Sequence, residues 1–204
     1  MDESLRALLD DLYRDGLRHD RAQADRLARR RNLEPDAAEL LWVIIRAMAA
    51  RHVVEVGTSN GYATIWLADA VRPGGGRVLS VDLDDQAQRH AADNLAAAGL
   101  SQVVELHTAD GGAVLAELPD GGADVVFLDS ERPEYPKWWP HPLRVLRPGG
   151  LLAVDNVLSH PDEVAPLLEI IEAEPALTAT VVSVGKGELL AVKSLSAAAL
   201  GDRS

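Results

Sequence analysis

The chain has 204 residues, and the 47% that are hydrophobic suffice for one well-buried domain. It contains no cysteine, which excludes disulfides and thiolate metal sites. No run of 18 apolar residues indicates a membrane helix, and the acidic start Met1-Asp2-Glu3-Ser4 does not resemble a signal peptide. These features predict a cytoplasmic protein with no membrane partner.

The charge balance argues against a polyanionic partner. Twenty Lys and Arg residues stand against thirty-two Asp and Glu residues, giving a net charge of −12. Nucleic acid is therefore not expected as a partner, because its binding depends on cations that neutralise phosphates. The local exception is a cluster of Arg26, Arg29, Arg30 and Arg31. We interpret this cluster as a solvated helix face, with a local anion contact as the alternative.

The chain divides into an N-terminal helical cap region over residues 1–50, an α/β domain over 51–194 and a tail over 195–204. Within the cap, a first helix is predicted by the helical spacing of Leu5, Leu8, Leu9 and Leu12. A second helix is expected over residues 21–31. A third follows over residues 36–48, with Pro35 near its first turn.

From residue 52 onward, strand-like and helix-like stretches alternate. Strands are predicted at 52–56, 77–81, 102–107, 123–128, 150–154, 178–184 and 188–193. Helices are predicted at 61–71, 84–98, 111–118, 134–146 and 162–173. This alternation indicates an α/β fold with a mostly parallel sheet and helices on both faces. Only Gly185-Lys186-Gly187 separates the last two strands, so the last strand must be antiparallel.

A glycine loop follows the first of these strands. It reads Gly57-Thr58-Ser59-Asn60-Gly61, so Ser59 occupies the place of the second glycine in a dinucleotide fingerprint. The bulky Tyr62 replaces the third glycine. The loop is therefore poorly suited to a pyrophosphate, and an NAD-type oxidoreductase is disfavoured. The alternative is that the loop is a generic tight turn between strand and helix without a binding role.

Acidic residues around this loop suit a cationic nucleoside. Glu55 would repel phosphate but would favour an ammonium or sulfonium group, such as those of S-adenosylmethionine. The N-terminus of the helix near Gly61 can hold the carboxylate of that cofactor. Asp82 ends the second strand and would accept hydrogen bonds from the ribose hydroxyls. Asp110 would contact the adenine, cap the next helix, or do both.

Oxygen ligands end the fourth and fifth predicted strands. Asp129 ends one, and Asp155 with Asn156 ends the other. Two carboxylates and a carboxamide form a hard site that suits Mg²⁺, or else Mn²⁺ or Ca²⁺. Such an ion could bind two adjacent hydroxyls and lower their pKa. In the alternative interpretation, Asp129 contacts only the cofactor and Asp155-Asn156 is a turn.

These residues belong to longer segments that resemble a known family, the class I S-adenosylmethionine-dependent O-methyltransferases of the catechol and caffeoyl-CoA type. The resembling segments are Val-Glu-Val-Gly-Thr-Ser-Asn-Gly-Tyr-Ala-Thr (54–64), Val-Leu-Ser-Val-Asp (78–82), Ala-Asp-Gly (109–111), Val-Phe-Leu-Asp-Ser-Glu-Arg-Pro-Glu-Tyr (126–135), Arg-Pro-Gly-Gly-Leu-Leu-Ala-Val-Asp-Asn-Val-Leu (147–158) and Lys-Gly-Glu-Leu-Leu-Ala-Val-Lys (186–193).

The resemblance implies a Rossmann-like seven-stranded sheet, a small catechol-like or phenolic substrate and a homodimer. It places the cofactor-binding role on Glu55, Gly57, Thr58, Ala63, Asp82 and Gly111. The glycine loop adds Ser59 and Gly61 as candidates, and the acids after the third and fourth predicted strands add Asp110 and Asp129. It places the metal on Asp129, Asp155 and Asn156.

One departure from the family concerns catalysis. The family usually has a lysine three residues after the first metal Asp, proposed as a base, and Arg132 stands there instead. A guanidinium does not lose its proton, so Arg132 could only stabilise an anion, with Asp129 as the other candidate catalytic residue. The departure leaves two alternatives open: a metal-independent methyltransferase with another acceptor, and a non-catalytic relative that binds the cofactor.

Overall fold

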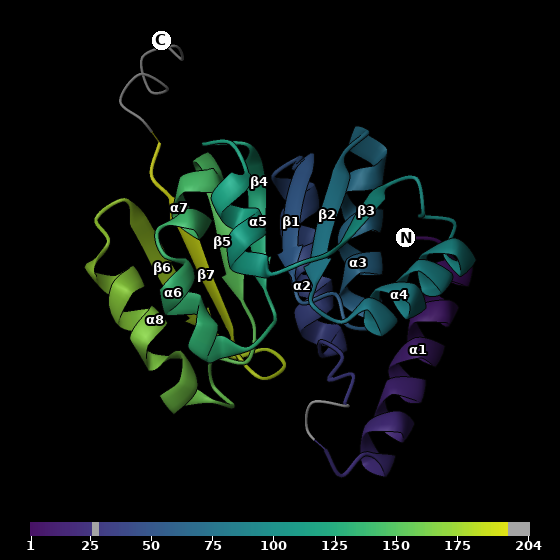
Figure 1. Cartoon of the computed structure of the whole chain (residues 1–204). Helices are drawn as coiled ribbons and strands as arrows, with labels where there is room; N and C mark the ends of the chain where they lie inside the picture. Colours follow the sequence, from purple (N-terminus) through teal and green to yellow (C-terminus); the bar gives the residue numbers. More distant parts are fainter. Residues whose placement is uncertain (26–28, 196–204) are drawn as a thin grey trace.

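The structure is a computed structural model, which describes residues 1–25 and 29–195 (Figure 1). Two helices, α1 (Glu3–Ala22) and α2 (Pro35–Ala47), precede the first strand. The seven strands are β1 (His52–Val56), β2 (Arg77–Asp82), β3 (Val104–Thr108), β4 (Ala123–Leu128), β5 (Leu146–Val154), β6 (Leu177–Val182) and β7 (Glu188–Lys193). The helices that connect them are α3 (Tyr62–Val71), α4 (Asp85–Ala97), α5 (Gly111–Glu117), α6 (Tyr135–Trp138), α7 (His141–Val145) and α8 (Pro161–Ala173).

The strands form one sheet in the order β3-β2-β1-β4-β5-β7-β6. All neighbours are parallel except where β7 pairs with β5 and with β6. The predicted seven-stranded sheet with one antiparallel strand is therefore confirmed. The order reverses direction between β1 and β4, where the chain has returned to the middle of the sheet. In such folds ligands bind at the carboxyl ends of the strands beside this reversal.

Alternate residues of the central strands belong to two separate hydrophobic cores, one on each face of the sheet. Val53, Val125 and Leu151 face one side of the sheet, together with residues of α1 to α4. Their successors Val54 and Val126 face the other side, with residues of α5 to α8. Because successive strand side chains point to opposite faces, a continuous apolar run is required where both faces are covered. Figure 1 shows these two helical layers.

The prediction of a helix over residues 21–31 is wrong for the described part of that range. Helix α1 already ends at Ala22, and residues 29–34 are irregular. The Asp20 carboxylate accepts hydrogen bonds from the backbone N–H groups of Arg30 at 2.7 Å and Arg31 at 2.9 Å. These bonds hold the returning chain against the end of α1. Residues 26–28 of that prediction lie outside the described residues, as does the predicted tail beyond Leu195.

The single helix predicted over residues 134–146 is also wrong. A short 3-10 turn at Arg132–Glu134 leads into α6, and the extended Trp139 separates α6 from α7. Pro140 explains the break, because proline cannot donate the helical hydrogen bond and disfavours a helical conformation at the preceding residue. Strand β5 then starts at Leu146, earlier than predicted. No described helix is long and apolar enough to cross a membrane.

Packing of α1 can be tested by truncating its buried face. Leu9 is 1% exposed and lies in the same core as β1, whereas Leu17 on the same helix is 41% exposed. Leu9→Ala should lower the free energy of unfolding by about 2–5 kcal/mol, because it removes transfer energy and leaves a cavity. Leu17→Ala should change it by less than about 1 kcal/mol. Urea unfolding of both variants measures the difference, and equal losses would show that α1 does not pack as described.

Candidate active site

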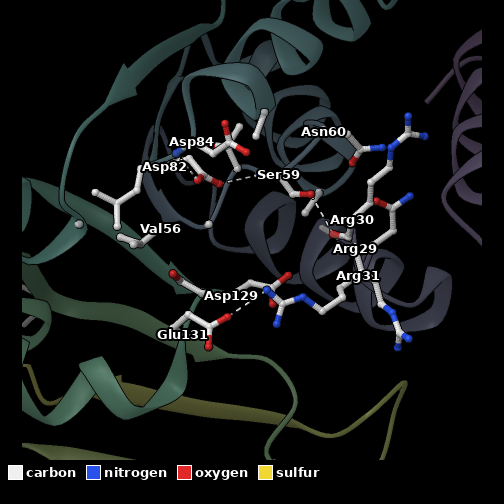
Figure 2. A pocket seen from close by; sticks show the side chains of 18 of the residues that line it. Arg29, Arg30, Arg31, Val56, Ser59, Asn60, Asp82, Asp84, Asp129 and Glu131 are labelled. Atoms are coloured by element: carbon white, nitrogen blue, oxygen red, sulfur yellow. Dashed lines mark hydrogen bonds and ion pairs between the residues drawn. The ribbon is translucent and has the colours of Figure 1, made fainter. Parts of the chain in front are cut away.

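A cavity of about 1090 Å³ opens at the carboxyl ends of β1, β2 and β4. Its walls come from the loop after β1, the end of β2, the start of α5, the segment after β4 and the irregular segment that includes Arg29, Arg30 and Arg31. Figure 2 shows Asp82 and Ser59 on one side of this cavity, Asp129 and Glu131 on another, and the three arginines opposite. Residues far apart in the sequence therefore meet in one place.

Gly57 lets the ends of β1 and β4 approach each other. Its φ is +110°, and a Cβ atom there would lie 2.0 Å from the carbonyl oxygen of Asp129. Two backbone bonds fix the junction: the Gly57 N–H donates to Val81 and the Asp129 N–H donates to Val56, each at 2.9 Å. No side chain fits between these backbones, so only glycine can occupy position 57 without moving Asp129.

The rest of the loop is tied to β2. The Ser59 N–H donates to Asp82 Oδ2 at 2.8 Å, and the Thr58 and Ser80 hydroxyls lie 2.6 Å apart. The N–H of Asp84 donates to the other Asp82 oxygen at 3.0 Å. Each Asp82 oxygen thus has one backbone partner, and each has a further lone pair for a ligand hydroxyl. Gly61, with φ +80°, ends the loop and starts α3, whose first residues Tyr62 and Ala63 line the cavity.

Asp110 lies at the start of α5. It caps this helix, which was one of its two predicted roles. Its carboxylate accepts the Ala113 N–H at 2.8 Å at the N-terminus of α5, and Asp110 also lines the cavity. Gly111 and Gly112 allow close packing, since a Cβ atom would lie 2.3 Å from Val56 at the first and 2.3 Å from Trp138 at the second. Trp138 is thereby held as a flat apolar wall of the cavity.

Glu55 lies inside the protein rather than at the cavity surface. It is fully buried, and its Oε2 accepts the hydroxyl hydrogens of Thr64 and Ser80 at 2.5 Å each. Burial raises the pKa of Glu55 to about 7, opposed by the bonds from Ser80 and Thr64 and reinforced by the charge of Asp82. This geometry does not support the predicted contact between Glu55 and the cofactor. Glu55 instead supports the glycine loop, because its carboxylate links Thr64 of α3 to Ser80 of β2.

The three predicted metal ligands do come together. The Asn156 amide nitrogen donates to Asp155 Oδ2 at 2.5 Å and lies 3.3 Å from Asp129 Oδ1. Asn156 adopts a φ of +70°, which turns its side chain back over the ends of β4 and β5. Asp155 is 2% exposed, and its Oδ1 has no hydrogen-bond partner. Among the described residues, no three His, Asp or Glu side chains form a group that could hold a metal ion, so a cation at this place would also require the oxygen of Asn156.

The carboxyl groups at these two strand ends are partly or fully buried and lie close to other charges. Burial, followed by the charges of Asp155 and Glu55, raises the pKa of Asp129 well above its usual value, and burial also raises that of Asp155. Glu188 at the start of β7 is a further, fully buried carboxyl group that was not among the candidate site residues. Burial and the charge of Asp155 raise the pKa of Glu188 to about 10. The available signal was an acidic residue directly before the apolar run Leu189–Val192.

The interpretation of the arginine cluster as a solvated helix face is wrong for Arg29, Arg30 and Arg31. All three line the cavity, and the Arg30 carbonyl accepts the Ser59 hydroxyl at 2.8 Å (Figure 2). Arg31 pairs with Glu131 at 3.0 Å, and Arg30 pairs with Asp15. Arg26 lies outside the described residues. The segment is irregular and faces the glycine loop, so its cations lie where an anionic group of a ligand can meet them.

Arg132 also lines the cavity, but its guanidinium is engaged on one side. It is 3% exposed, and its Nε donates to Glu163 of α8 at 2.8 Å. One terminal nitrogen of Arg132 is buried without a hydrogen-bond partner. The Ser159 hydroxyl lies 2.8 Å from the Nδ1 atom of His160, another residue at the cavity.

The raised pKa of Glu55 predicts a specific pH dependence of stability. Because the folded protein holds this proton up to about pH 7, its stability should fall by up to about 3 kcal/mol as the pH rises from 4.5 to 7. Glu55→Gln should remove this loss, so that the variant gains stability relative to the wild type over that window. Urea unfolding across the pH range measures it. Exposed Glu169 provides the control, since Glu169→Gln should run parallel to the wild type.

The sequence was compared with known proteins. The O-methyltransferase family model matches residues 6–193. A catechol O-methyltransferase from Niastella koreensis is 32% identical over 130 residues, which is 62% of this chain and 58% of that protein. A catechol O-methyltransferase from Mycobacterium tuberculosis is 31% identical over 139 residues, or 68% of this chain and 61% of that protein. The alignments thus span less than two thirds of both relatives.

The fold has solved counterparts. An O-methyltransferase from Streptomyces achromogenes, crystallised with S-adenosylmethionine, superposes with a TM-score of 0.74 at 28% identity. The match covers 95% of this chain and 91% of that one. The Rossmann-like fold and the resemblance noted from the sequence are therefore confirmed. With a family model that spans nearly the whole chain, this protein belongs to the O-methyltransferase family.

Proposed function

We propose that this protein transfers the methyl group of S-adenosylmethionine to a hydroxyl of a small catechol-like or phenolic substrate, with the help of a divalent cation. One observation carries the proposal. The glycine loop and Asp82 adjoin the cavity that also contains Asp129 and Asn156. A nucleoside site and a hard oxygen site therefore share one wall, which is the arrangement that a metal-assisted methyl transfer requires.

Several residues support binding of the cofactor. Asp82 has lone pairs free for the ribose hydroxyls, and Gly57, Thr58, Ser59 and Gly61 bring backbone close to the ligand. The α3 N-terminus at Tyr62 and Ala63 suits the carboxylate of the cofactor. Trp138, Asp110 and Gly111 form the wall for the adenine. Asp129 lies between this region and the acceptor and can contact both.

The donor set also fits a divalent cation. Oxygens of Asp129, Asp155 and Asn156 meet at two strand ends, and Asp155 Oδ1 is buried and unpartnered. A cation there would compensate the repulsion that raises the pKa of Asp129. Mg²⁺ suits this set, and Mn²⁺ or Ca²⁺ would use the same oxygens. When bound, the ion would lower the pKa of the acceptor hydroxyl and hold it in place.

The chain's own groups position the reaction. Gly57 and the β1–β4 junction fix Asp129 beside the glycine loop, so an acceptor near Asp129 faces a methyl group held by that loop. Effective concentration and alignment supply much of the rate enhancement in such a geometry. Arg132, held by Glu163, contributes positive charge at the cavity without acting as a base. The homodimer and the cytoplasmic location stay predictions.

Cofactor binding through Asp82 can be tested by removing its charge. Asp82→Asn should weaken binding of S-adenosylmethionine by about 10- to 100-fold, because a charge-assisted hydrogen bond is worth about 1.5–3 kcal/mol. Asp85→Asn is the matched control, since Asp85 lies at the surface in an ion pair with Arg89. Isothermal titration calorimetry measures both affinities. A wild-type protein that binds no S-adenosylmethionine would refute the proposed function.

The metal role of Asp155 predicts two opposite effects of one substitution. Asp155→Asn should abolish magnesium-stimulated transfer, with a loss of at least about 100-fold, while changing cofactor affinity only a few-fold. In metal-free protein at pH 8, the same variant should melt at a higher temperature than the wild type, because it removes a carboxylate whose burial costs free energy.

The control for this experiment is Asp162→Asn at the exposed start of α8, which should change neither property. Activity assays with and without a chelator, and melting curves with and without Mg²⁺, provide the readouts. Wild-type transfer that is unaffected by the chelator would favour the metal-independent alternative with a different acceptor.

A further inference from the structure

The chain has three lysines, and the structure places one of them in the cavity. Lys137 forms an exposed ion pair with Glu134, and Lys193 donates to the carbonyls of Leu143 and Leu146. Lys186 lines the cavity from the turn between β6 and β7. This turn is distant in sequence from Arg132, where the family resemblance predicts a lysine.

The topology explains why Lys186 reaches the site. Strand β7 is antiparallel to β5, with Leu189 opposite Val154. The start of β7 therefore lies at the same edge of the sheet as the carboxyl end of β5, which leads into Asp155 and Asn156. A residue just before β7 is consequently a spatial neighbour of the proposed metal ligands.

Backbone contacts hold the turn against the loop after β5. The Lys186 carbonyl accepts the N–H groups of Leu158 at 3.0 Å and Ser159 at 3.1 Å, and the Gly187 carbonyl accepts that of Val157 at 3.0 Å. At Gly187, with φ +95°, a Cβ atom would lie 2.4 Å from the Leu158 side chain. Lys186 is thus anchored at its backbone, while its side chain can sample the cavity.

The positive charge of Lys186 acts on the carboxyl groups at the ends of both β4 and β5. It lowers the pKa of Asp129 and that of Asp155, partly offsetting the increase due to burial. Its Nζ pairs with Glu34 at 3.0 Å, and both side chains are about one third exposed, at 37% and 27%. Such a solvated pair is weak and can exchange partners. Arg132, by contrast, is buried and bound to Glu163.

We propose that Lys186 donates a hydrogen bond to the acceptor oxygen that attacks the methyl group, and so stabilises that oxygen in its deprotonated form. This inference rests on the proposed function. The acceptor hydroxyl loses its proton to solvent through the open cavity. The oxygen then forms a bond to the methyl carbon as the carbon–sulfur bond breaks, and the sulfur keeps the electron pair. The neutral thioether product and the methyl ether result.

The role is electrostatic, so the charge of the side chain matters rather than its basicity. Lys186→Met should lower kcat by about 100-fold with little change in KM, because the interaction strengthens as charge develops on the oxygen. Lys186→Arg should retain at least about a tenth of the wild-type rate. Lys137→Met is the matched control and should behave as the wild type. Glu34→Gln removes the ion pair but keeps the ammonium, and should also behave as the wild type.

A second readout does not depend on turnover. The probe is 4-nitrocatechol, whose ionised form absorbs visible light, titrated with pH in the presence of S-adenosylhomocysteine. Lys186→Met should raise the apparent pKa of the bound probe by roughly one unit or more, and Lys186→Arg should not. Glu34 pairs with Lys186, and the charge of Lys186 lowers the pKa values of Asp129 and Asp155. Asp36 accepts the N–H of the adjacent Gly185, and His160 lines the same cavity. All of them remain in every Lys186 variant, and Glu34→Gln controls for the nearest.

The outcomes separate this inference from the proposed function. A wild type that binds S-adenosylmethionine but methylates none of a panel of diols and phenols would refute both. A wild type that is active, with Lys186→Met unchanged in kcat and in the pKa of the bound probe, would overturn the Lys186 role alone. The same holds if Glu34→Gln reproduces the loss, since the effect would then come from the ion pair. Equal losses in the Arg and Met variants would overturn the electrostatic role.

Discussion

The close approach of β1 and β4 at Gly57 determines the geometry of the whole site. A Cβ atom at this position would overlap the Asp129 carbonyl, so the absence of a side chain is what allows the two strand ends to touch. From this junction the chain leaves β1 towards α3 on one face and leaves β4 towards α6 on the other. The loops diverge there and leave a cavity between them. Asp82 and Asp129 lie on opposite sides of this junction, within reach of one ligand (Figure 2).

Near that junction, the ends of β1, β4 and β5 and the start of β7 bring several carboxyl groups together in a poorly solvated place. Glu55, Asp129, Asp155 and Glu188 all have raised pKa values, mainly because of burial, and the last three also repel one another or their neighbours. Most folds avoid such clusters because each ionised group costs free energy when it leaves water. A protein that retains one gains a strong preference for cations. Under the proposed function, the electrostatic cost of burying Asp129 and Asp155 would be offset when a divalent cation binds between them.

The sequence predicted the sheet well, because apolar runs that alternate with helical periodicity leave few other topologies. It also predicted that Asp129, Asp155 and Asn156 would meet, since carboxyl ends of neighbouring parallel strands share an edge. It failed where tertiary contacts outweigh local propensity. No local pattern within residues 21–31 indicates that the Asp20 carboxylate accepts hydrogen bonds from the backbone N–H groups of Arg30 and Arg31. Nor does the strand-end position of Glu55 reveal that its side chain turns inwards to Thr64 and Ser80.

The role proposed for Lys186 illustrates the same limit. Along the chain, the first basic residue after Asp129 is Arg132, which is buried and bound to Glu163. In the fold, Lys186 also lines the cavity, because the antiparallel β7 brings the turn before it to the edge where the parallel strands end. The two cations differ in what they can do, since a buried, paired guanidinium has little freedom to follow a developing charge. Under the proposed role, the partly exposed ammonium of Lys186 leaves Glu34 when a stronger anion forms in the cavity. Under this proposal, a role that the family resemblance assigns to position 132 is filled by a residue in the turn before β7, provided that its ammonium reaches the same atom.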